Sequence, residues 1–166
     1  KVLKFKKLIL ATGGKSYPLT GSTGDGYKFA QKLGHKIVPL RPSLIPIETE
    51  EAWVKDLQGL SLKNILLTTY CKRKKIHEEF GEMMFTHYGI SGPVVLTMSN
   101  YINKYENKTI KFAIDLKPAL SIENLDTRIL KDFKKYNNKK IKNGLDDLLP
   151  KKLIPVVIRE ANIDEE

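Results

Sequence analysis

The stretch "LILATGGKSYPLTGSTGDGYKFAQKLG", residues 8–34, places a glycine-rich loop between an apolar run and a helical pattern. Leu8–Ala11 is short, apolar and stopped by glycine, which predicts a strand buried on both faces in a parallel sheet. After the loop, apolar residues recur at helical spacing, with Thr23 or Asp25 as the expected N-cap and Gly34 just past the helix end. The first part of the chain is therefore predicted to be strand, glycine loop and helix.

The glycine loop does not fit either of two common phosphate-binding motifs. A P-loop ending in residues 14–16 needs a glycine five places before its second glycine, where Ile9 stands. The glycines of residues 21–26 run in the order G-x-x-G-x-G, the reverse of the dinucleotide fingerprint. Glycines after a parallel strand nevertheless let backbone approach a ligand, and N–H groups at a helix start favour an anionic or electron-rich group. Spacing alone leaves ligand binding and a plain tight turn equally open.

The rest of the chain changes to short strands followed by helices. Prolines punctuate residues 39–46, as expected of an irregular or edge strand. Further strands are predicted over residues 60–70, 74–88 and 109–116, and a helix is predicted to start near Pro93. Short strands in succession indicate a small antiparallel sheet or barrel.

Helices are predicted from Ser121 onward. Ser121 is the expected N-cap of the first helix, and a second, short helix is predicted over residues 141–149. A third helix carries Pro155 in its first turn, where proline is tolerated. One apolar stripe follows the first helix: Ile122, Leu125, Ile129, Phe133 and Tyr136. We expect this stripe to form the core of a helical subdomain, with docking of a partner as the alternative.

Composition limits the class of protein. The 166 residues suffice for one ordinary domain or two small ones, and no apolar run approaches the length of a membrane span. The net charge of +10 suggests nucleic-acid binding, but nearly all the cations are lysines and few aromatics lie among them. Solvated surface lysines are therefore favoured, and Lys72–Lys75 is expected to be a hairpin turn with solvated charges.

Two further features of the sequence concern its context. Cys71 is the single cysteine, which excludes an intramolecular disulfide and fits a reducing, cytoplasmic compartment. The chain starts at Lys1 and enters a predicted strand almost at once, so we expect a fragment of a longer protein.

Six segments resemble one family of flavoproteins when taken in order along the chain. They are "LATGG", "TGSTGDGYKFAQKLGH", "RPSLIPIET", "LQGLSLKN", "GEMMFTHYGISGPVVLTMS" and "IDLKPALS". Together they resemble the aminoacetone-oxidase-like, BaiN-like family of FAD-dependent NAD(P) oxidoreductases. The resemblance covers essentially the whole chain, and residues 85–93 are its most distinctive part.

This resemblance implies an α+β fold in which an FAD-binding α/β domain is interrupted by an insert. Residues 1–36 would be a strand-loop-helix remnant of the FAD-binding domain. Residues 37–118 would be an inserted small antiparallel β-barrel, and residues 119–166 its helical subdomain.

The resemblance also implies where the cofactor lies. FAD would be lined by Thr12, Gly13 and Gly14, with Gly24 and Asp25 close behind. The family's pyrophosphate-binding glycine motif and its C-terminal flavin-closing segment are missing from this sequence. We therefore expect this chain alone to bind FAD weakly or not at all, to be inactive, and to partner with the remainder of the FAD-binding domain.

His87 and Ser91 are the candidate catalytic residues. Their motif "THYGISGP" fails as a hydrolase nucleophile elbow, because Pro93 stands where G-x-S-x-G requires its last glycine. The resemblance instead implies a turn facing the flavin and substrate, with His87 as proton donor or polar contact. Three scattered histidines and one cysteine give no metal-site spacing, so no metal is expected.

Two functions follow as expectations. The chain is an insert-domain fragment of an FAD-dependent oxidoreductase, capping the flavin and shaping the pocket of a small-molecule substrate, with NAD(P) as a possible second cofactor. The alternative is a basic β-barrel module that binds nucleic acid or a protein partner. Steep salt dependence of binding would distinguish a nucleic-acid module from the insert domain.

Overall fold

The computed structural model describes residues 2–105, 109–136 and 141–163, and the chain forms two compact units. Unit 1 is Lys1–Arg41 and unit 2 is Pro42–Glu166. The finer division of unit 2 into a barrel and a helical subdomain remains a prediction.

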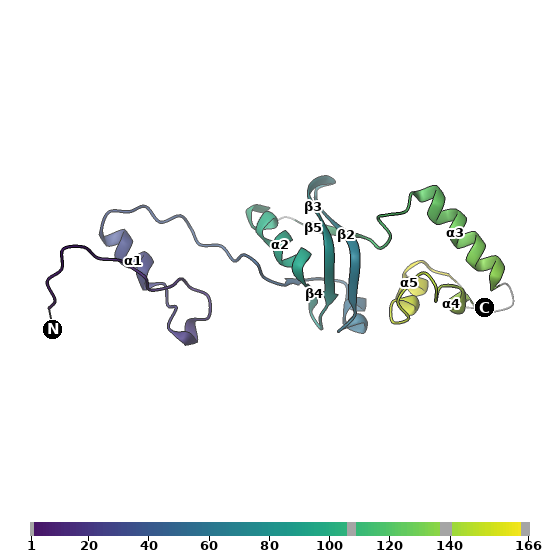
Figure 1. The fold of residues 1–166 in the computed structure, drawn as a ribbon, viewed down its shortest axis with the longest axis horizontal. Helices are drawn as coiled ribbons and strands as arrows, with labels where there is room; N and C mark the ends of the chain where they lie inside the picture. The colour runs from purple at the N-terminus through teal and green to yellow at the C-terminus, as the bar shows by residue number, and fades with distance from the viewer. Residues whose placement is uncertain (1, 106–108, 137–140, 164–166) are drawn as a thin grey trace. The chain divides into compact units, whose positions relative to one another are not determined.

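Unit 1 holds a short 3-10 helix, η1 (Pro18–Thr20), and the helix α1 (Asp25–Lys32) (Figure 1). Gly34 follows α1 with φ +91°, the left-handed conformation expected of a residue just past a helix end, so this prediction is confirmed. The strand predicted at Leu8–Ala11 is wrong, since these residues form no strand and Ile9 is 88% exposed. A strand needs a neighbour for its backbone hydrogen bonds, and no strand lies among the described residues of unit 1.

Unit 2 is built on a five-stranded antiparallel sheet with strand order β1-β4-β3-β2-β5. The strands are β1 (Ile47–Glu48), β2 (Ser61–Cys71), β3 (Lys74–Phe85), β4 (Gly89–Ser91) and β5 (Ile110–Asp115). Ile47 of one edge strand and Ile114 of the other line the same hollow of about 530 Å³. The sheet is therefore curled into half of a barrel, and the predicted α+β class with a small antiparallel barrel is confirmed.

Local sequence signals explain the strands. In β5 the apolar residues Ile110, Phe112 and Ile114 are half-buried while the residues between them are exposed, which confirms the predicted alternation. Lys72 and Arg73 join β2 to β3 with φ +48° and +67°, as a two-residue type I′ hairpin turn requires. The proline-rich segment supplies only the two-residue edge strand β1.

The core of unit 2 is formed by side chains of the sheet, of η2 (Ala52–Leu57) and α2 (Pro93–Ile102), and of the start of the C-terminal helix described below. Helix α2 begins at Pro93 as predicted and packs against β3. Its Val95 and Met98 are fully buried, as is Leu67 of β2. Burial of each such side chain stabilises the fold by about 1.5–3 kcal/mol.

The C-terminal part of unit 2 is helical. It contains the short η3 (Asn103–Tyr105) before β5, and then α3 (Ile122–Lys135), α4 (Ile141–Gly144) and α5 (Ile154–Glu160). Ser121 caps α3 as predicted, since its Oγ accepts a hydrogen bond from the Asn124 backbone N–H at 3.2 Å. Helix α4 is shorter than predicted, whereas Pro155 stands in the first turn of α5 as expected.

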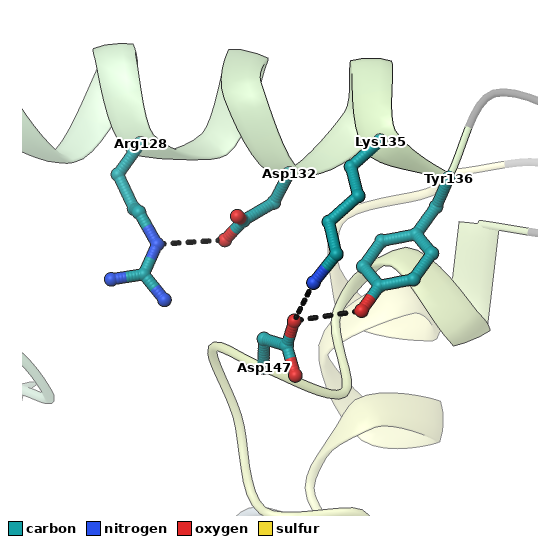
Figure 2. A network of polar contacts seen from close by, with 5 residues as sticks. All are labelled: Arg128, Asp132, Lys135, Tyr136 and Asp147. Carbon is teal, nitrogen blue, oxygen red and sulfur yellow. Dashed lines mark hydrogen bonds and ion pairs between the residues drawn. The ribbon is translucent and has the colours of Figure 1, made fainter.

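A polar network connects α3 to the segment that precedes α5 (Figure 2). The Asp147 carboxylate accepts hydrogen bonds from the Tyr136 hydroxyl at 2.8 Å and from Lys135 Nζ at 3.1 Å. These two donors, Tyr136 first, hold the pKa of Asp147 below its ordinary value of 3.8. The apolar stripe of α3 is only partly covered, because Ile122 is exposed and Leu125, Ile129, Phe133 and Tyr136 are half-buried.

Helix α5 joins this helical part to the sheet. Val156 and the preceding Leu153 belong to the core cluster of unit 2. At the surface, Arg159 pairs with Asp56 of η2 at 3.0 Å. Within the described ranges, every helix is too short or too polar to cross a bilayer.

Candidate functional site

The glycine loop of unit 1, residues 12–15, lies against the first turn of α1. A Cβ on Gly26 would overlap the hydroxyl of Thr12, and one on Gly24 would come within 2.9 Å of the Lys15 Cγ. Gly24 also has φ +82°, which disfavours any side chain there. Gly24 is thus favoured by its backbone conformation, and Gly26 leaves room for the Thr12 hydroxyl where the loop packs on the helix start.

The five candidate FAD-binding residues therefore belong to one local structure. Thr12 and Gly13 are exposed at its surface, Gly14 is half-buried, and Gly24 is buried beneath Lys15. Asp25, the first residue of α1, is half-buried. The loop is open to solvent on the side of Thr12 and Gly13.

Asp25 is held by its own neighbours. Thr23 Oγ1 donates a hydrogen bond to its Oδ2 at 2.9 Å, and Lys28 Nζ donates to its Oδ1 at 2.9 Å. These bonds, that of Lys28 first, hold the pKa of Asp25 below its ordinary value of 3.8, so it is ionised at neutral pH. The predicted N-cap, Thr23 or Asp25, is wrong: Gly24 occupies this position because the Thr23 hydroxyl bonds the carboxylate instead of the backbone.

In unit 2, His87 lies in the tight turn between β3 and β4. The Thr86 backbone N–H donates to the Gly89 carbonyl at 2.8 Å, and the Gly89 N–H donates to Thr86 Oγ1 at 3.1 Å. The His87 ring is exposed and stands edge-on to the Tyr88 ring, with centroids 4.7 Å apart. The turn is thus fixed by its first and last residues while its histidine faces solvent.

Ser91 is the last residue of β4. It is half-buried and pairs with Met84 of β3. His87 and Ser91 consequently belong to one turn-and-strand segment, with His87 before the three-residue strand and Ser91 at its end.

The glycines of this segment have packing roles. A Cβ on Gly89 would overlap the Ile47 carbonyl oxygen, because β1 lies directly against β4 there. Gly92 has φ +98°, and a Cβ on it would stand 2.9 Å from the Met83 Cα. The distinctive motif of residues 85–93 is therefore explained in large part by close backbone approach.

The profile of the family described as HI0933-like protein barrel and H2TH domain matches residues 41–166. The chain belongs to the HI0933-like family. The matched range covers the whole of unit 2, including the half-barrel and the three C-terminal helices.

Curated relatives of this HI0933-like chain carry two kinds of name. It is 35% identical over 163 residues to a protein of Haemophilus influenzae and 31% identical over 149 residues to one of Escherichia coli, both called ribosomal RNA dihydrouridine synthase. It is 30% identical over 159 residues to a 3-dehydro-bile acid delta(4,6)-reductase of Clostridium scindens. These alignments cover 97%, 90% and 95% of this chain respectively.

The chain spans only 35–39% of the length of these relatives. The expected membership of the BaiN-like flavoproteins is confirmed by the family match and by the bile-acid reductase.

Sequence reasoning missed two supporting residues of the HI0933-like chain. Thr86 closes the His87 turn with its hydroxyl, and a Ser or Thr two or three residues before a glycine is the signal that indicates such a turn. Lys28 neutralises Asp25, and their spacing of three residues on a helix predicts this pair. Among the described residues, histidine, cysteine and carboxylate side chains gather nowhere in a group of three that could hold a metal.

Proposed function

We propose that this chain is part of a longer FAD-dependent oxidoreductase in which unit 2 caps the flavin and shapes the substrate pocket. The apolar run before the glycine loop carries the proposal. Leu8, Ile9 and Leu10 are 57%, 88% and 42% exposed, although they form the most continuous apolar segment of unit 1. Such a run needs a covering partner. The remainder of an FAD-binding sheet supplies one, since the relatives are more than twice the length of this chain.

The loop residues suit a dinucleotide ligand. Thr12 and Gly13 are exposed beside the start of an eight-residue helix, where free backbone N–H groups favour anionic groups. The Asp25 carboxylate keeps spare lone pairs that can accept hydrogen bonds from sugar or ribityl hydroxyls, even with Thr23 and Lys28 bound. We assign Thr12, Gly13, Gly14, Gly24 and Asp25 to the FAD side of the protein. FAD itself supplies hydride transfer when bound, with NAD(P)H as the proposed reductant.

His87 and Ser91 are proposed to act on the substrate. One kind of relative is named a reductase and the other is named for making dihydrouridine. We propose that this chain serves a reduction of the same class, which would add a proton as well as a hydride to the substrate. A histidine in an exposed turn can donate that proton, and general acid catalysis contributes about 100- to 10,000-fold to rate. The Ser91 hydroxyl is proposed to orient the substrate by a hydrogen bond.

The test is His87→Ala in the longer protein. Turnover should fall by about 100-fold or more while the flavin content stays unchanged. His35→Ala is the matched control, because His35 is also an exposed histidine, located after α1. Unchanged kinetics in the His87 variant would remove this residue from the mechanism.

Ribosomal RNA is a second candidate substrate in place of a small molecule. Two relatives carry that substrate in their names, and the net charge of +10 suits a polyanion. Binding of RNA by this chain should fall steeply with rising salt, whereas a domain that serves only a small uncharged substrate should show no saturable RNA binding at physiological salt. The same measurement also tests the alternative function, a basic module that binds nucleic acid without flavin: such a module should show the same steep salt dependence.

We also propose a cytoplasmic location. Cys71 is a free thiol and is buried, which fits a reducing compartment.

A further inference from the structure

We propose that the tip of the β2–β3 hairpin and the adjoining end of β5 form a contact surface for single-stranded RNA. The hairpin surface is defined by Tyr70, Lys72, Arg73 and Lys111. These residues line one open hollow of about 940 Å³ together with Thr109, Phe112 and Ala113. The inference rests on the proposed ribosomal RNA substrate and adds where this chain would hold it.

Strand pairing brings the aromatic ring and the cations together. Tyr70 of β2 is directly opposite Lys111 of β5 on one side and Lys75 of β3 on the other. Side chains directly opposite each other in antiparallel strands project from the same face. Tyr70 is half-buried, so one part of the ring is held by the sheet and another part is accessible. The arrangement is an aromatic ring between two lysines on the outer face of the half-barrel.

The hairpin turn adds two more cations beyond the end of the sheet. Lys72 and Arg73 are both exposed, and their positive φ values hold them at the tip of the hairpin. Lys75 is already paired with Glu78 at 3.0 Å. Within the described part of the chain, Lys72, Arg73 and Lys111 form no ion pair, so their charges are available to an outside anion.

The chemistry of the surface selects its partner. Lysines and an arginine along a groove attract a phosphate backbone, and a base can stack on the tyrosine ring. This combination suits unpaired nucleotides, whose bases are free to stack, better than a duplex. An acidic protein or an anionic membrane would use the cations but would gain nothing specific from the ring.

The charge test replaces three cations by residues that suit their positions. The site variant is Lys72→Asn, Arg73→Gly and Lys111→Thr: Asn-Gly is the preferred type I′ turn, and threonine is a good strand residue. The hairpin should therefore fold at least as well as before. The matched control is Lys131→Gln, Lys134→Gln and Lys151→Gln, which removes the same charge from exposed positions elsewhere in unit 2.

Fluorescence anisotropy with a labelled unstructured RNA oligonucleotide measures the result on the 166-residue chain. The site variant should bind at least tenfold more weakly, and its salt slope should fall by about 2, since each lost contact to a single strand removes about 0.7. The control variant should stay close to the wild type. Equal losses in both variants would overturn the proposal, because net charge alone would then explain binding.

Substitutions at Tyr70 distinguish binding of RNA from binding of other anions. Tyr70→Leu should weaken binding of the oligonucleotide by roughly fivefold to a hundredfold, whereas Tyr70→Phe, which keeps the ring, should change it little. Neither variant should alter binding of heparin or of phosphatidylserine vesicles. Equal effects of Tyr70→Leu on RNA and heparin would contradict base stacking and overturn the assignment to RNA.

The flavin content of the longer protein distinguishes this inference from the proposed function. If that protein holds FAD and oxidises NAD(P)H while this chain fails to bind RNA, the hairpin surface is refuted and the oxidoreductase proposal stands. If RNA binds at the hairpin but the longer protein holds no flavin, the oxidoreductase proposal fails and the hairpin surface stands.

Discussion

Gly89→Ala tests how the turn carrying His87 is held in place. A Cβ at this position would overlap the Ile47 carbonyl oxygen and would stand 2.9 Å from the Glu48 Cα. Both neighbours are backbone atoms of β1, so no side chain can rotate away. Forcing a methyl group into such a contact costs about 1–3 kcal/mol, and displacing β1 forfeits ladder hydrogen bonds of about 0.5–1.5 kcal/mol each. We expect the free energy of unfolding of unit 2 to fall by about 2–4 kcal/mol.

Urea denaturation followed by tryptophan fluorescence measures this loss. Trp53 is the single tryptophan and packs edge-on to Phe85 in unit 2, with ring centroids 6.1 Å apart. Gly59→Ala is the control, because a Cβ there meets open space and only the φ of +82° is strained, at about 1 kcal/mol. A Gly89 variant as stable as the Gly59 variant would refute the close approach of β1 to β4.

Two further predictions concern α3. Ser121→Ala should lower the free energy of unfolding by about 1 kcal/mol, measured by circular dichroism in urea, because it removes the helix cap; an unchanged midpoint would contradict the cap. Asp147→Asn should lower the melting temperature at pH 7. Hydrogen bonds from Tyr136 and Lys135 lower the pKa of Asp147 in the folded protein, so the ionised carboxylate stabilises the fold at pH values above the unfolded pKa of 3.8. This difference should vanish as the pH falls through the lowered folded pKa, and a difference that persists in acid would contradict the network.

The sequence predicts most of unit 2 because its signals are local. Alternation in β5, the Ser121 cap and Pro93 at the start of α2 each depend on residues within a few positions. Such signals do not depend on residues that are distant in the sequence. The end of α1 is also a local feature, because the positive φ of Gly34 ends the helix without any contact from a distant part of the chain.

Features that depend on neighbours distant in the sequence could not be predicted in this way. Leu8–Ala11 has the composition of a buried strand, but composition does not say which strands pair with it. Tyr70 meets Lys111 only because β2 pairs with β5, and no local pattern indicates that pairing. The roles of Gly24 and Gly26 likewise depend on Lys15 and Thr12, which lie 9 and 14 positions away and pack on them.

The visible absorbance spectrum of the longer protein tests the central claim most directly. The longer protein should purify yellow, with about one flavin per chain, and an Asp25→Ala substitution at the start of α1 should lower that content. The 166-residue chain purified alone should carry little or none. A colourless longer protein that takes up no added FAD would contradict the assignment of this chain to an FAD-dependent oxidoreductase.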